Sequence, residues 1–106
     1  MSALIVHCSC PDLETAGRIA GALVEERLAA CVQALPGMVS TYRWGGRVER
    51  ADEILLLIKT TRARLAALKL RVGDLHPHDV PELLAIDVVD GRDSYLDWIG
   101  AATAAP

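Results

Sequence analysis

Phenylalanine is absent from this chain of 106 residues, and aromatic residues make up only 4% of it. The interior must therefore be built from Leu, Val, Ile and Ala, in a chain that is 52% hydrophobic with a mean hydropathy of +0.28. A single small domain has a limited interior, so part of this apolar surface is expected in a subunit interface. The scarcity of aromatic rings also argues against RNA recognition, which stacks bases on aromatic side chains.

Basic patches, long apolar runs and a secretion signal are missing as well. The formal net charge is −3, whereas nucleic-acid binders usually carry a basic surface. No run of 18 apolar residues could cross a membrane, and the first residues lack the charged start and cleavage site of a signal peptide. Three cysteines cannot all pair within one chain, and their spacing matches no zinc finger. We therefore expect a cytoplasmic protein with free thiols, and no nucleic-acid or membrane partner.

Hydrophobic periodicity predicts one domain spanning residues 1–106, with four strands and three helices. The strands are expected at Ala3–Ser9, Cys31–Trp44, Arg47–Thr60 and Glu82–Val89, and the helices at 12–30, 61–75 and Ser94–Ile99. Gly45-Gly46 is typical of a hairpin turn, and the tail Ala101–Pro106 is expected to be loose.

This order of elements predicts an α+β, ferredoxin-like βαββαβ sandwich with a short C-terminal helix. Both main helices would cover one side of the sheet and leave the other side open. Because the open side is also apolar, the fold gives a second reason to expect assembly through the sheet.

The segment His76–Glu82 is the strongest local candidate for chemistry. It holds two histidines, two carboxylates and two prolines. Imidazole and carboxylate are usual ligands for transition metals, and prolines restrict the backbone that carries them. The sequence therefore predicts a metal-binding loop.

Several motifs, in order across residues 5–99, together resemble the CutA family of divalent-cation tolerance proteins. They are Cys10-Pro11-Asp12, Leu23–Val32, Tyr42-Arg43-Trp44, Leu57–Thr61, His76-Pro77, Val80-Pro81-Glu82, Asp90-Gly91 and Tyr95–Ile99. The resemblance implies a ferredoxin-like homotrimer without catalytic activity, linked to tolerance of copper and other divalent cations and to copper binding.

The resemblance also implies that Cys8 and His76 occupy the family's metal-binding positions. Two departures stand beside them: Leu75 replaces a second histidine found in some members, and His78 replaces the usual tyrosine. His78 is therefore a candidate additional ligand. Thiolate and imidazole suit Cu(I), Cu(II) or zinc. The alternative is structural, with Cys8 a buried core residue and His76 ending a helix with its ring bonded to the backbone.

The other two cysteines also have alternative interpretations. Cys10 lies on the same strand face as Cys8 and could complete a vicinal thiol pair for a soft metal, although a position at the helix start is favoured. Cys31 is expected in the core.

Two further sets of residues are predicted at interfaces. Arg43, Lys59 and Glu82 are candidates for a cleft between subunits, either as ion pairs, which are favoured, or as an anion site. Lys59 is expected to contact Glu53, Glu82 or a bound anion. The packing candidates are Trp44, Tyr95 and Trp98; the last two are expected to face inward, with Trp98 anchoring the C-terminal helix.

The sequence thus predicts a non-enzymatic homotrimer that binds copper or another divalent cation and contributes to the response to metal ions. The alternative is a trimeric small-molecule or anion sensor that uses the clefts between subunits. An enzyme is disfavoured, because no Gly-rich phosphate loop, paired acid and base, or Ser-His-Asp pattern is present.

Overall fold

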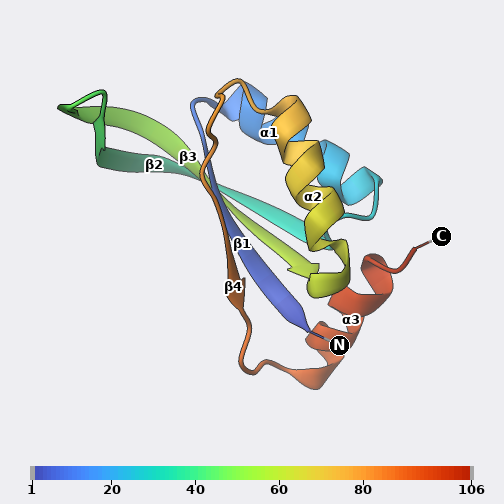
Figure 1. Cartoon of the computed structure of the whole chain (residues 1–106). Coiled ribbons are helices and arrows are strands. Elements are labelled where there is room, and N and C mark those ends of the chain that lie inside the picture. Colours follow the sequence, from blue (N-terminus) through green and yellow to red (C-terminus); the bar gives the residue numbers. More distant parts are fainter. Residues whose placement is uncertain (1, 106) are drawn as a thin grey trace.

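The computed structural model describes residues 2–105 and confirms the predicted order of elements. The strands are β1 (Ala3–Cys10), β2 (Cys31–Trp44), β3 (Arg47–Thr61) and β4 (Leu83–Asp87), and the helices are α1 (Leu13–Glu25), α2 (Arg62–Leu75) and α3 (Asp93–Ala102). The sheet has the order β2-β3-β1-β4, and all neighbours are antiparallel. α1 and α2 lie on one face of this sheet, and α3 lies near the start of β1 (Figure 1). The α+β ferredoxin-like fold is therefore confirmed.

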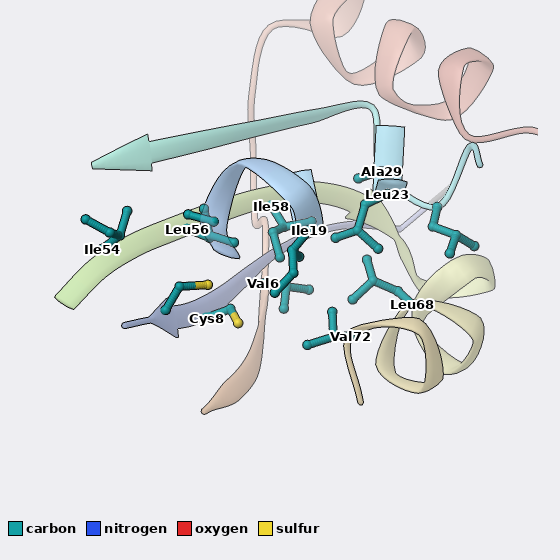
Figure 2. Packing of buried hydrophobic residues seen from close by; sticks show 13 residues of the cluster. Val6, Cys8, Ile19, Leu23, Ala29, Ile54, Leu56, Ile58, Leu68 and Val72 are labelled. Atoms are coloured by element: carbon teal, nitrogen blue, oxygen red, sulfur yellow. The ribbon is translucent and has the colours of Figure 1, made fainter. Parts of the chain in front are cut away.

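The main core lies between the sheet and α1 and α2. β1 contributes alternate residues, and the register places Val6 opposite Ile58 and Cys8 opposite Leu56 on β3. Because side chains alternate along a strand, this puts both apolar series on the helix side. Ile19 and Leu23 of α1 and Leu68 and Val72 of α2 pack against this side of the sheet (Figure 2).

The hairpin formed by β2 and β3 extends past the rest of the sheet (Figure 1), and the molecule measures 44 × 26 × 21 Å. Its turn needs positive φ at two successive residues, Gly45 (+59°) and Gly46 (+77°), which glycine adopts without strain. A register shift lies between Leu35 and Met38, where Pro36 has no N–H to donate to the ladder.

The connection from α1 to β2 is held by its backbone and by one buried hydroxyl. Leu28 donates its N–H to the Leu23 carbonyl, Arg27 donates to Val24, and Arg27 adopts φ +59°. This is the helix-ending pattern that normally uses glycine. The fully buried Thr60 hydroxyl donates to the Leu28 carbonyl at 2.7 Å, which ties this connection to β3.

The C-terminal helix differs from the prediction. Ile99 faces inward, but Tyr95 and Trp98 are about half exposed, with ring centroids 5.4 Å apart. The expectation that Trp98 anchors the helix by burial is therefore wrong for the single chain. Ile99 anchors the helix instead, because it is buried in a small cluster with Ala3 and Ala30. The helix continues to Ala102 and Thr103 is buried, so residues 101–103 do not belong to a loose tail.

The open face of the sheet carries exposed apolar side chains. On β4 these are Leu84 and Ile86, which lie opposite His7 and Ile5 of β1. Leu35 of β2, which lies opposite Leu55 of β3, is exposed on the same face. β4 is shorter than predicted at both ends. Among the described residues, no helix is long and apolar enough to cross a membrane.

Candidate metal centre

One group among residues 2–105 has the donor types and spacing to hold a transition metal: Cys8, Cys10 and His76. Their ligand atoms lie within 4.8 Å of one another, and all three residues are buried. The two cysteines lie near the end of β1. Because residues two apart share a strand face, both point to the side of the sheet that the helices cover. His76 is the C-cap of α2 and comes from the opposite layer.

His76 reaches the thiols because α2 stops there. Pro77 follows it, and a residue before proline is driven from helical into extended conformation; His76 has φ −79° and ψ 136°. Its ring then turns back toward β1, where Nε2 lies 2.8 Å from the Ser9 carbonyl. Because a carbonyl only accepts, Nε2 must carry the proton.

The second ring nitrogen is occupied as well. The backbone N–H of His78 donates to His76 Nδ1 at 3.1 Å, which requires the same tautomer with Nδ1 unprotonated. Both imidazole nitrogens therefore have backbone partners. The histidine therefore ends the helix with its ring bonded to backbone, as the structural alternative expected, and its role as a metal ligand stays a prediction.

The two thiols influence each other strongly. A side-chain hydrogen bond with Cys10, followed by burial, raises the pKa of Cys8 far above its ordinary range. The same hydrogen bond lowers the pKa of Cys10. Cys10 is therefore the thiol that loses its proton first. The Cys8 sulfur also lies 3.9 Å from the Ser9 carbonyl, so this carbonyl is near both the Cys8 thiol and the His76 imidazole.

Cys10 ends β1 two residues before Asp12, the N-cap of α1, and so lies at the helix start as expected. It also lies in the main core together with Cys8. Its position two residues along the same strand was the signal that pointed to the pair. Cys31 is not a core residue: it is half-buried and lies opposite Lys59, outside the core cluster.

His78 does not join the donor group. It contributes its backbone N–H, and its ring lies 4.8 Å from the His76 ring, centroid to centroid, at 59°. The side chain is exposed and lines the largest described pocket. Leu75, in the position of the lost histidine, packs against the core.

That pocket has a volume of about 570 Å³ and lies between the outer part of the hairpin and the segment 77–82. Tyr42 and Trp44 form its aromatic side, and Glu53, Asp79 and Glu82 supply its charge. Neither Lys nor Arg is among its described lining residues. The pocket is therefore unsuited to an anion.

The set Arg43, Lys59 and Glu82 is not brought together within one chain. Arg43 lies opposite Val48 near the hairpin turn, and Lys59 is eleven residues further along β3, which is about 36 Å at 3.3 Å per residue. Lys59 donates to Gln33 Oε1 at 2.6 Å rather than to an acid. Glu82 Oε2 lies 3.6 Å from Nδ1 of His7, whose side chain is partly exposed. A role for the set between subunits stays a prediction.

Comparison with known proteins agrees with this architecture. The family model described as CutA1 divalent ion tolerance protein matches residues 4–102. The divalent-cation tolerance protein CutA of Thermus thermophilus is 50% identical over 95 residues, covering 90% of this chain and 92% of that protein. The solved structure of the Thermus thermophilus divalent cation tolerance protein (Cut A1) has a TM-score of 0.95 at 48% identity, covering 96% of this chain and 99% of that one. CutA1 from Oryza sativa has a TM-score of 0.96 at 38% identity, covering 100% and 97%. The chain therefore belongs to the CutA1 family of divalent ion tolerance proteins.

Proposed function

We propose that this chain binds copper or another divalent metal ion and contributes to the response to metal ions, without catalysing a reaction. The observation that carries the proposal is the buried group of Cys8, Cys10 and His76, with ligand atoms within 4.8 Å. Two thiols and an imidazole are ligands of copper and zinc, whereas magnesium and calcium require oxygen donors. The chemistry of the donor group therefore fits a soft or borderline metal.

The alternative of an anion sensor receives less support. The largest described pocket is lined by three carboxylates, so it would repel an anion. The candidate cations Arg43 and Lys59 lie at opposite ends of the hairpin strands. Only a cleft formed between subunits could bring such groups together.

We also propose assembly as a homotrimer in the cytoplasm. Exposed apolar side chains on the open sheet face support assembly, because a monomer rarely leaves such a face uncovered; they include Leu35, Leu84 and Ile86. Three unpaired thiols fit a reducing compartment. Sedimentation of the purified chain tests the first point: a stable monomer would contradict it.

The test of metal binding is equilibrium dialysis of the fully reduced chain against copper and zinc salts, with bound metal counted per chain. Wild type and Cys31→Ala, whose changed thiol lies outside the group, should each bind one ion. The double variant Cys8→Ala/Cys10→Ala should not, provided that circular dichroism shows it folded. Equal binding by the double variant and wild type would refute the site. The wider role is tested by measuring how well cells that lack the protein grow in medium containing copper.

A further inference from the structure

The three donors of the candidate metal centre are not equally free. Each imidazole nitrogen of His76 already has a backbone partner, the Ser9 carbonyl at 2.8 Å and the His78 N–H at 3.1 Å. A metal on either nitrogen would have to displace a hydrogen bond, one of which is buried. Cys8 and Cys10 make no comparable contact beyond each other and the weak Cys8 approach to Ser9. The sulfurs are the available ligands.

We propose that Cys8 and Cys10 together bind a single cuprous ion through sulfur alone, and that His76 is a positioning residue. The inference deepens the proposed function by naming the ion and by separating ligands from support. It replaces the pairing of Cys8 with His76 that the family resemblance implies.

The spacing of the sulfurs fits this ion. Two metal–sulfur bonds of about 2.3 Å can join sulfurs that lie up to about 4.6 Å apart, and the ligand atoms of the whole group lie no more than 4.8 Å from one another. Structural zinc takes four ligands in a tetrahedron, and the described residues near the thiols offer only the engaged His76 as a third. A soft monovalent ion is satisfied by fewer donors, and thiolates select Cu(I). Binding releases the two thiol protons and changes no oxidation state.

The positioning role follows from the peptide that separates the ligands. Ser9 lies between Cys8 and Cys10 in the sequence, and its buried carbonyl accepts the Nε2 proton of His76. This hydrogen bond ties the strand segment between the sulfurs to the end of α2. Such supporting contacts commonly contribute about 10–100-fold to metal affinity.

The experiment supplies Cu(I) without oxygen to the reduced chain, measures affinity against a coloured Cu(I) chelator, and records X-ray absorption of the loaded wild type. Absorption should show sulfur scatterers without imidazole. Cys8→Ala and Cys10→Ala should each lose more affinity than any change at His76, while Cys31→Ala should match wild type. His76→Ala should lose about 10–100-fold, and His76→Gln, whose amide can still donate to Ser9, should recover most of it.

Imidazole scattering in the wild-type spectrum, or unchanged Cu(I) affinity of a folded Cys10→Ala variant, would overturn the inference. Either result would leave the proposed function standing, because a metal would still be bound in the group. Absence of any bound copper or zinc in wild type would instead refute both. The wild-type spectrum decides the question even if a cysteine variant fails to fold.

Discussion

The sharpest prediction concerns His76 in the metal-free protein. Replacing it with alanine removes the donor to the buried Ser9 carbonyl and the acceptor for the His78 N–H. An unsatisfied buried acceptor costs about 1–3 kcal/mol, and loss of a partly buried hydrogen bond costs about 0.5–1.5 kcal/mol. We therefore expect His76→Ala to lower the free energy of unfolding by about 1.5–4.5 kcal/mol, a large part of the about 5–15 kcal/mol typical of a domain.

Two further substitutions separate the ring nitrogens. The amide nitrogen of glutamine can take the place of Nε2, and the amide oxygen of asparagine can take the place of Nδ1. His76→Gln should keep the bond to Ser9 and recover the larger share, whereas His76→Asn should recover the smaller one. The matched control is His78→Ala, which removes the neighbouring imidazole but leaves its backbone N–H, and should change stability by less than about 0.5 kcal/mol.

The assay is urea unfolding of chelator-treated protein at one fixed chain concentration, because assembly would make stability concentration-dependent. The midpoint should shift while the slope stays constant. If His76→Ala unfolds at the same urea concentration as wild type, or if the glutamine and alanine variants are equal, the structural role argued for the ring is wrong.

Four other predictions follow from single contacts. Thr60→Val should destabilise the chain by about 1–3 kcal/mol because the Leu28 carbonyl loses its donor, while Thr60→Ser keeps the hydroxyl; thermal melts that rank valine above serine would contradict this. Arg27→Gly should raise the unfolding free energy by about 0.5–1 kcal/mol, because glycine relieves the positive φ, and Arg27→Ala, which keeps the strain, should not. A hydrogen bond from the Thr15 backbone lowers the pKa of Asp12, so its contribution to stability is present above the unfolded value and is lost as pH falls through the folded one; Asp12→Asn should therefore flatten the loss of stability below about pH 4. In native, reduced protein a thiol reagent should label Cys31 rapidly and the two fully buried strand thiols only as the chain opens; three equal rates would disprove their burial.

The fold was predictable because its determinants are local. Alternation along β1 and the long apolar run of β3 place one residue series of each strand toward the helices. Gly45-Gly46 fixes the hairpin turn through positive φ. These signals need only neighbouring residues, and the predicted order of elements was confirmed on that basis.

The errors came from contacts that a residue type does not determine. Trp98 was placed inward because tryptophan is large and apolar, yet the smaller Ile99 faces the sheet and Trp98 pairs with Tyr95 at the surface. Lys59 was expected to contact Glu53, Glu82 or a bound anion, whereas within the single chain it donates to Gln33 of the neighbouring strand β2. Both outcomes depend on how an element is rotated or which strand lies beside it.

The candidate site joins a local signal to a distant one. Cys8 and Cys10 share a face because they are two apart on a strand, which the sequence reveals. The contact of His76 with Ser9 spans 67 positions of the chain, and no spacing rule predicts it. The histidine could be identified from the sequence as a candidate ligand, but only the structure shows that both of its ring nitrogens have backbone hydrogen-bond partners.

The His76-Pro77 pair therefore has a different meaning in three dimensions than in the sequence. Proline forces His76 out of the helix, and this change of direction brings the ring to the Ser9 peptide rather than to open solvent. In this position both nitrogens of the imidazole form hydrogen bonds with backbone groups. A segment rich in possible ligands thus first connects α2 to β1, and the two strand sulfurs are the donors without a strong hydrogen-bond partner. The segment's remaining acids and His78 face the neighbouring pocket, so residue composition alone points to that pocket and not to the strand thiols.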